Sequence, residues 1–233
     1  MIGTRIHVGD AYQTPRILLS IPTTGWIHKT IAQWLLQVIA IEQVSHRCSF
    51  DVIMPTHVPF ENNLHHIVQD VIDKDYDFWI SIDQDNPPMK NVLDVVFLDK
   101  DIIGCPTPVW HFADDKPGER PIYWNGYDYF EPEDGYKEHD EKEGLQSVDA
   151  VGTGCIIIAR RVLMHRDMQK GCFSRILNSN GTVYKGNDLA FCERARAAGF
   201  SIWCHYNYPC RHVVELELME SVKAMQGLIE NAS

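Results

Sequence analysis

The stretch Asp77-Phe78-Trp79-Ile80-Ser81-Ile82-Asp83-Gln84-Asp85-Asn86-Pro87-Pro88 places two carboxylates directly after a short, largely apolar run. The run over 78–82 predicts a buried strand. Alternate side chains of an extended chain point the same way, so Asp83 and Asp85 are expected to converge. Buried acids need a compensating cation, and Mg²⁺ or Mn²⁺ prefers oxygen ligands. The pattern therefore favours a divalent-metal site over the alternative of a solvated turn, which Asp and Asn also favour.

Upstream of this run, strand-like and helical apolar spacings alternate. Strands are expected over 17–21, 50–54 and 78–82, and the spacing of apolar residues predicts helices over 27–41 and 64–72. Such a strand–helix series implies parallel pairing and right-handed crossovers. Ligands of open α/β sheets bind beyond the carboxyl ends of the strands. Three segments are therefore candidates for the site: Pro22-Thr23-Thr24, Pro55-Thr56-His57 and Asp83-Gln84-Asp85.

Downstream, a short helix over 92–98 and a strand over 102–105 precede a change of composition. Residues 111–147 are rich in Asp, Glu, Gly, Pro and Tyr, which predicts a long surface excursion or hairpin. Apolar structure resumes from 148 to 159. Helices are expected at 161–168, 188–198 and about 216–230, with a strand at 200–204 and Gly199 just after a helix end. The chain is thus predicted to be an α/β protein with a mostly parallel open sheet flanked by helices.

Composition narrows the class of protein. The 233 residues carry 21 Lys+Arg against 32 Asp+Glu, a formal charge of −11, which disfavours a general binder of nucleic-acid backbones. The length fits one domain. We find no apolar run long enough for a membrane span and no signal-peptide core in the first residues. Seven cysteines without a CxxC pair predict free thiols in a reducing compartment, so a cytoplasmic location is expected.

The charge is unevenly distributed along the chain. Residues 128–143 hold eight acids and two bases (−6), whereas residues 151–212 hold nine bases and three acids (+6). The basic part is a candidate phosphate-facing or polyanion-facing surface, or else a set of solvated helix faces. Its members include Arg160, Arg161, Arg166, Lys170, Lys185 and Arg211. An anionic acceptor therefore stays open, and residues 128–143 are a candidate mobile flap beside that surface.

Four segments, in order, resemble one family. These are Ile17 to Thr24, Phe78 to Asp85, Val148-Asp149-Ala150-Val151-Gly152-Thr153-Gly154 with the strand and arginines after it, and Gly186-Asn187-Asp188 with its helix and the later His212. Together they are similar to small GT-A-fold glycosyltransferases of the family 2-like, bacterial or phage type. The resemblance implies one GT-A-like (Rossmann-like) catalytic domain. Its nucleotide-binding half would span about 15–105, its acceptor-side half about 148–212, and a C-terminal helix about 215–231.

The resemblance also implies roles for single residues. Asp83 and Asp85 would form the family's DxD motif, with Asp85 and His212 as ligands of Mn²⁺ or Mg²⁺ and Asp83 near the metal or the ribose. Asp188 would be the catalytic base for an acceptor hydroxyl. Many relatives carry two adjacent acids here, whereas this chain has Asn187 before Asp188. Inverting and retaining chemistry therefore both stay open, as does a plain helix-start role for Asp188.

Other residues are expected around the donor and acceptor. Pro22, Thr23 and Thr24 would contact the base and ribose of a nucleotide-sugar donor, with UDP-sugar favoured. Asn63, or alternatively Asn62 or His66, would assist from the second predicted helix. Gly152, Thr153 and Gly154 would allow close approach of donor sugar or acceptor. Trp110 and Trp124 would offer apolar faces to a sugar, or else pack in the core.

Alternatives differ in reaction class. A nucleotidyltransferase also uses paired carboxylates with a metal, but Ile21-Pro22-Thr23-Thr24-Gly25-Trp26 lacks a Gly- and basic-rich phosphate loop. A non-catalytic nucleotide- or sugar-binding relative stays open. A structural zinc module is disfavoured because Cys192, Cys204, His205, Cys210 and His212 do not form paired ligands at short fixed spacings. The acceptor is expected to be a glycan, with a hydroxymethylated base in phage-type DNA as a second class.

Overall fold

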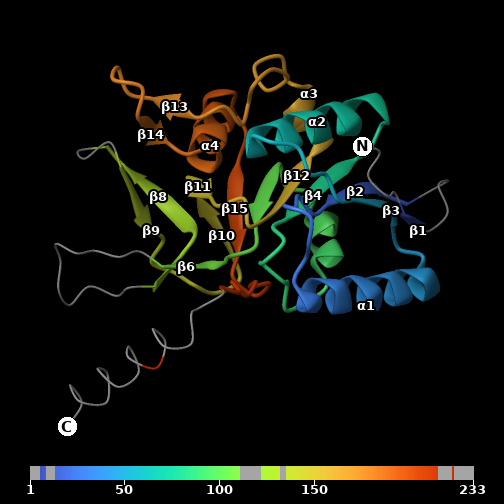
Figure 1. Cartoon of the computed structure of the whole chain (residues 1–233). Helices are drawn as coiled ribbons and strands as arrows, with labels where there is room; N and C mark the ends of the chain where they lie inside the picture. The colour runs from blue at the N-terminus through green and yellow to red at the C-terminus, as the bar shows by residue number, and fades with distance from the viewer. Residues whose placement is uncertain (1–5, 9–13, 111–121, 132–134, 215–221, 223–233) are drawn as a thin grey trace, which may run out of the picture.

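The computed structural model describes residues 6–8, 14–110, 122–131, 135–214 and 222. An eight-stranded sheet lies at its centre, in the order β1-β3-β2-β4-β12-β5-β15-β10 (Figure 1). The strands are β1 (Ile6–Val8), β2 (Arg16–Ser20), β3 (Ser49–Ile53), β4 (Phe78–Ile82), β5 (Ile102–Gly104), β10 (Leu145–Val148), β12 (Cys155–Ala159) and β15 (Ile202–His205). The strands predicted over 17–21, 50–54, 78–82 and 102–105 are confirmed within a residue at each end.

The sheet is mixed. β2 pairs in parallel with both β3 and β4, and β5 pairs in parallel with β15. β12 lies antiparallel between β4 and β5, and β1 and β10 are antiparallel edge strands. Five strands thus run one way (β2, β3, β4, β5, β15) and three run the other. The predicted parallel series is confirmed for the first half, while the second half adds strands of both directions.

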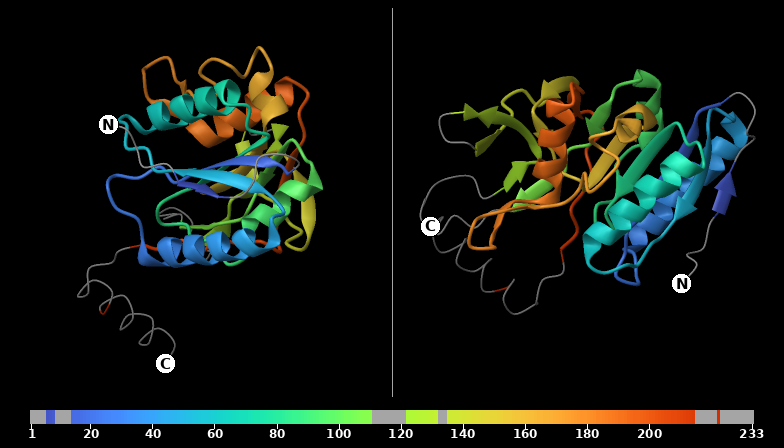
Figure 2. Two further views of the ribbon diagram at one scale, coloured as in Figure 1. Left: turned by 90° about the vertical axis from the view of Figure 1, so that its right-hand side faces the viewer. Right: turned by 90° about the horizontal axis from the view of Figure 1, so that it is seen from above.

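Helices cover both faces of the sheet (Figures 1 and 2). Helix α1 (Lys29–Ser45) and the 3₁₀ helix η1 (Val92–Leu98) pack on one face; α2 (Phe60–Asp73), α3 (Arg160–Met164) and α4 (Asn187–Ala197) pack on the other. Two buried clusters result because adjacent strand residues point to opposite faces. In β4, Trp79 belongs to the cluster beneath α2, and Ile80 to the cluster above α1. This two-sided burial explains why the strands are almost wholly apolar.

Part of the predicted excursion is regular structure. Small antiparallel sheets join β6 (Pro108–Trp110) to β7 (Ile122–Trp124), and β8 (Gly126–Phe130) to β9 (Gly135–Glu138) and β11 (Ala150–Val151). β10 returns to the main sheet. A further hairpin, β13 (Ile176–Leu177) with β14 (Val183–Lys185), precedes α4. The predicted alternative of a hairpin within 111–147 is confirmed by the antiparallel pair of β8 and β9. The bounds of the short strands were not predicted, because their residues are mostly polar or aromatic, without a continuous apolar run.

Helix α4 ends as predicted. Gly199 has φ +89° and follows Ala198, and the Phe200 N–H donates to the carbonyl of Ala195 at 3.0 Å. This geometry closes the last helical turn. The predicted helix over 216–230 lies outside the described residues. Within the described part, no helix has the length and apolar character needed to cross a membrane.

Candidate active site

The segments that follow β2, β3 and β4 lie side by side at one edge of the sheet. The Thr23 N–H donates to the carbonyl of Pro55 at 3.0 Å, which joins the ends of β2 and β3. The Thr24 N–H donates to the Oε1 atom of Gln84 at 2.9 Å, which joins the β2 end to the segment after β4. The three strand ends identified from the sequence are therefore neighbours, as expected for a shared carboxyl edge.

The backbone of Asp83 is hydrogen-bonded to a residue in the second half of the chain. Its N–H donates to the carbonyl of Gly154 at 2.9 Å, in the turn before β12. Burial first, then the carboxylates of Asp85 and Asp188, raise the pKa of Asp83 to about 7. The 83–85 pair from β4 and the acid from α4 are thus close enough to repel one another. Three carboxylates this close together repel one another, and a bound cation would offset that repulsion.

His212 faces Asp85. The Nε2 atom of His212 lies 3.8 Å from the Oδ2 atom of Asp85, and the Val213 N–H donates to the carbonyl of Asp85 at 2.8 Å. The Nδ1 atom of His212 lies 2.9 Å from the carbonyl oxygen of Pro108. A carbonyl only accepts, so Nδ1 carries the proton in this bond. In the neutral imidazole the lone pair is then on Nε2, the atom that faces Asp85. That arrangement orients a histidine for metal ligation.

Asp188 lies in the first turn of α4, one residue after the helix begins at Asn187. Its Oδ1 atom accepts a hydrogen bond from the Leu189 N–H at 2.8 Å. Burial raises the pKa of this carboxyl, and the backbone hydrogen bond partly offsets the rise. Gly186 precedes it, and a Cβ at that position would stand 2.8 Å from the Oδ1 atom of Asp188. The carboxylate is therefore held close to the backbone at a half-buried position.

Gly152 and Gly154 do allow a close approach, but by this chain's own side chains. A Cβ on Gly152 would lie 2.3 Å from the Nδ2 atom of Asn125, and one on Gly154 would lie 2.9 Å from the Nδ2 atom of Asn86. Thr107, whose N–H donates to the Oδ1 atom of Asn125 at 2.7 Å, completes this buried polar group. The glycines thus make room for Asn86 and Asn125. Thr153, between them, is half-buried.

The residues predicted to bind the nucleotide fall into two groups. Pro22 is buried, Thr23 is half-buried and Thr24 is exposed, and all three stand at the shared strand edge. Asn63 is buried in α2, where its Oδ1 atom accepts the N–H of His57 at 2.6 Å. Asn63 therefore fixes the segment after β3, and its side-chain oxygen is already engaged.

The two candidate tryptophans also differ. The backbone of Trp110 ends β6, and its side chain lies outside the described part. Trp124 is half-buried and packs against the cluster that includes α4. The backbone N–H of Trp124 donates to the Oε1 atom of Glu138 at 2.7 Å. Trp124 is therefore a packing residue at the base of the β8–β9 hairpin.

Tyr127 is a site residue that the sequence did not reveal. It lies on β8 opposite Ala150, and it is half-buried. Burial first, then the carboxylates of Asp188 and Glu138, raise its pKa to about 12. The phenol is therefore protonated near Asp188 and offers a hydrogen-bond donor there. Tyr127 belongs to the polar excursion, where no periodicity marks one tyrosine above another.

The two arginines directly after β12 do not face this edge. Ala159, the last residue of β12, pairs with Phe78 at the start of β4, which is the opposite edge of the sheet. Arg160 pairs with Asp75 at 2.6 Å, and Arg161 pairs with Asp101 at 2.7 Å. The interpretation of these two arginines as phosphate-facing is therefore wrong. The antiparallel direction of β12 carries them away from the site and into local ion pairs.

Within the described residues, no three His, Cys, Asp or Glu side chains are arranged to hold a metal ion by themselves. The closest approach to such a set at this edge is the pair of Asp85 and His212, with Asp83 beside it. Two protein ligands suffice where a substrate's phosphate oxygens and water complete the coordination, as is common for Mg²⁺.

Comparisons with known proteins define the fold. No protein-family model and no curated protein matches the sequence. Among solved structures, A197 from STIV aligns with TM-score 0.51 and 14% identity, covering 86% of each chain. GalNAc-T7, solved with UDP, GalNAc and Mn²⁺, aligns with TM-score 0.50 and 11% identity, covering 88% of this chain and 44% of that one. Apo UDP-glucose pyrophosphorylase reaches only 0.44, with 8% identity over 85% and 92% of the two chains, too low to indicate a shared fold.

The comparisons and the strand order thus establish the fold of the protein. The chain has a GT-A-like α/β fold, with a mixed central sheet between helical layers and polar residues gathered at the carboxyl edge of its parallel strands. It spans less than half the length of GalNAc-T7. At these identities the likeness concerns the fold, and the chemistry is argued below from the residues.

Proposed function

We propose that this protein is a metal-dependent glycosyltransferase, which moves a sugar from a nucleotide-sugar donor to an acceptor hydroxyl. The observation that carries the proposal is the convergence of Asp83, Asp85 and Asp188 from two distant parts of the chain, with His212 beside Asp85. The GT-A-like fold supports it, and so does the presence of UDP, GalNAc and Mn²⁺ in the GalNAc-T7 structure. UDP is therefore the favoured donor nucleotide.

Asp85 and His212 would hold Mn²⁺ or Mg²⁺. The residues fit this role because Asp85 supplies an anionic oxygen and the neutral form of His212 has its Nε2 lone pair on the side of Asp85. The nearby Asp83 adds charge that a cation would offset. When bound, the ion would offset the charge on the departing nucleoside diphosphate. Thr23 and Thr24, at the same edge, would contact the base and ribose.

Asp188 would act as the general base. An acceptor O–H donates to its carboxylate, and the proton moves to Asp188 as the acceptor oxygen bonds to the anomeric carbon and the bond to the nucleoside diphosphate breaks. Burial raises the pKa of Asp188, which makes the carboxylate a stronger base than a solvated one. The phenol of Tyr127 would orient the acceptor or the carboxylate.

A donor screen tests the proposal. UDP-, GDP- and CMP-sugars are incubated with Mn²⁺ and with glycan or hydroxymethylated-DNA acceptors. A parallel incubation supplies a nucleoside triphosphate and a sugar 1-phosphate instead. Released nucleoside diphosphate, nucleoside monophosphate and pyrophosphate are quantified separately. We expect the nucleotide of the transferred sugar, with UDP-sugars the best donors. Release of pyrophosphate from a nucleoside triphosphate would instead indicate a nucleotidyltransferase. Binding of UDP without turnover of any donor would indicate a non-catalytic relative.

The metal ligands are tested separately by binding. Asp85→Asn and His212→Gln should each weaken Mn²⁺-dependent UDP binding by roughly 10–100-fold, as loss of an ordered metal ligand or its support does. Asp167→Asn, an exposed carboxylate after α3, is the matched control. Unchanged UDP affinity in both site variants would remove the metal from the proposal.

A further inference from the structure

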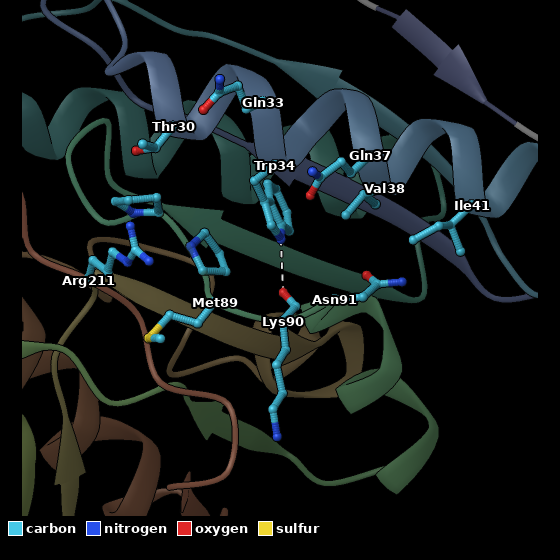
Figure 3. Close-up of a pocket in the computed structure, with 12 residues that line it drawn as sticks. Thr30, Gln33, Trp34, Gln37, Val38, Ile41, Met89, Lys90, Asn91 and Arg211 are labelled. Atoms are coloured by element: carbon cyan, nitrogen blue, oxygen red, sulfur yellow. Dashed lines mark hydrogen bonds between the residues drawn. The ribbon is translucent and has the colours of Figure 1, made fainter.

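A pocket of about 290 Å³ lies between helix α1 and the segment that follows Asp85 (Figure 3). One wall is helix α1, and the other is the run 87–91 together with Arg211. The groove extends along α1, from Thr30 and Arg211 at one end to Ile41 and Asn91 at the other. Its volume is close to the lower bound for small-molecule sites, so its occupant is a compact molecule.

The lining combines an apolar floor with a few polar groups. Trp34 and Val38 are buried in the floor, and the Trp34 indole N–H donates to the carbonyl of Lys90 at 2.8 Å. Gln33 and Gln37 supply exposed amides from α1. No Asp or Glu is among the lining residues, although the chain as a whole carries a charge of −11.

Arg211 provides the charge of the pocket. It is exposed, and its guanidinium has no ion pair or hydrogen bond with any other residue that the structure describes. Lys90 contributes less, because its side chain points away from α1 and its ammonium lies 5.4 Å from the centre of the Tyr208 ring. A free guanidinium is suited to a carboxylate or phosphate, which it binds through two parallel hydrogen bonds.

We propose that this pocket binds a small organic anion, with its apolar body against Trp34 and Val38 and its phosphate or carboxylate on Arg211. The lining of this pocket shares no residue with the set assigned above to the donor, the metal or the acceptor. Binding itself does not depend on the proposed function.

The pocket is joined to the candidate metal ligands by the backbone. The Arg211 N–H donates to the carbonyl of Pro87 at 3.0 Å, and the Val213 N–H donates to the carbonyl of Asp85 at 2.8 Å. These two hydrogen bonds pair the backbone of residues 211–213 with that of residues 85–87. Arg211 in this segment lines the pocket, and the adjacent His212 lies beside Asp85. We expect an anion that restrains Arg211 to restrain both candidate ligands and so to change the affinity for the donor. Linkage then requires the donor to change the affinity for the anion by the same factor. This coupling, unlike the pocket, rests on the proposed function.

Calorimetric titration with phenyl phosphate and benzoate tests the pocket, in EDTA and without nucleotide, with phenol as the neutral control. We expect one equivalent of either anion to bind at least tenfold more tightly than phenol. Arg211→Gln should weaken anion binding by roughly 10–100-fold, as the loss of a charge-assisted hydrogen bond does. Lys29→Gln, an exposed α1 cation outside the pocket, should stay within about twofold of wild type.

A filling variant locates the ligand. Gln37→Trp should occlude the groove and abolish anion binding, whereas Leu36→Trp, at an exposed position outside the pocket, should not. Asp85→Asn should still bind phenyl phosphate, which separates this pocket from the donor site. The proposal is overturned if wild type binds neither anion, or if binding survives both Arg211→Gln and Gln37→Trp.

The coupling has its own readout. Saturating phenyl phosphate should change the Kd for UDP with Mn²⁺ by at least threefold, and this change should vanish in Arg211→Gln. An unchanged Kd would overturn the coupling. If UDP does not bind at all, the proposed function fails while the pocket result stands by itself.

Discussion

At the residue scale, the site brings together groups that are far apart in the chain. Asp83 and Asp188 are separated by more than one hundred positions, yet their carboxylates interact strongly enough to affect the pKa of Asp83. Asp83 was expected from its position at a strand end, and Asp188 from the resemblance of its segment to a known family; the roles of both stay predictions. The sequence did not predict Tyr127 or the engagement of Asn63, since those depend on which side chains the fold brings into contact.

Asp188→Asn tests the base directly. The amide keeps the shape of the carboxylate but accepts no proton, so we expect kcat to fall by roughly 10²–10⁴-fold. UDP affinity in Mn²⁺ should change by less than about threefold, because we propose that Asp188 acts on the acceptor and not on the nucleotide. Steady-state kinetics and calorimetry check the two quantities. Full activity in the variant would assign Asp188 to the helix start alone.

Glu42 gives a stability prediction away from the site. Its side chain is fully buried near the end of α1, where burial opposes its charge but hydrogen bonds from Arg47, Ser45 and Asn91 outweigh burial and lower its pKa. A carboxyl with a lowered folded-state pKa contributes stability above its ordinary pKa of 4.5, and loses it as pH falls through the folded value.

Glu42→Gln should therefore reduce the free energy of unfolding by about 1–3 kcal/mol at pH 7. The difference from wild type should shrink below pH 4.5, as the wild-type carboxylate takes up a proton. Urea denaturation at several pH values measures this, with the exposed Glu141→Gln as control. A difference that does not vary with pH would show that shape, and not charge, is responsible.

At the element scale, β12 determines what the second half of the chain presents to the site. Its apolar run was predicted, but its antiparallel insertion between β4 and β5 was not, because apolar content reports burial and carries no direction. The direction decides which end of β12 meets Asp83: Gly154 lies at that edge, while Arg160 and Arg161 lie at the other. The positions of the strands were thus easier to predict from the sequence than the way they pair.

The start of α4 yields a test of positioning. Gly186 has φ −61°, so Ala is tolerated by the backbone, but its Cβ would lie 2.8 Å from the Oδ1 atom of Asp188. The carboxylate must then move. We expect Gly186→Ala to lower kcat by roughly 10–100-fold, with a change in the free energy of unfolding below about 1 kcal/mol. Parallel kinetics and thermal melts check this, and unaltered kcat would show that the observed carboxylate position is not needed.

At the scale of the whole molecule, binding should be visible as stability. A ligand that binds only the folded state stabilises it by about 2.7 kcal/mol at one hundred times its Kd. UDP and Mn²⁺ together should therefore raise the Tm, whereas either alone should raise it less, since Asp85 and His212 provide only part of a coordination shell. EDTA should reverse the shift. Equal shifts from UDP with and without Mn²⁺ would argue against metal-assisted donor binding.

The strand order has a consequence for how the chain is made. β4 and β5 are both synthesised well before β12, which must later fill the gap between them. Until residue 159 has left the ribosome, two apolar strands have unpaired edges, and such edges favour association with other chains. We therefore expect chaperones to bind a nascent chain that is arrested before residue 155. Once Cys155–Ala159 has emerged, β12 can pair with both β4 and β5 and cover the edges that face each other.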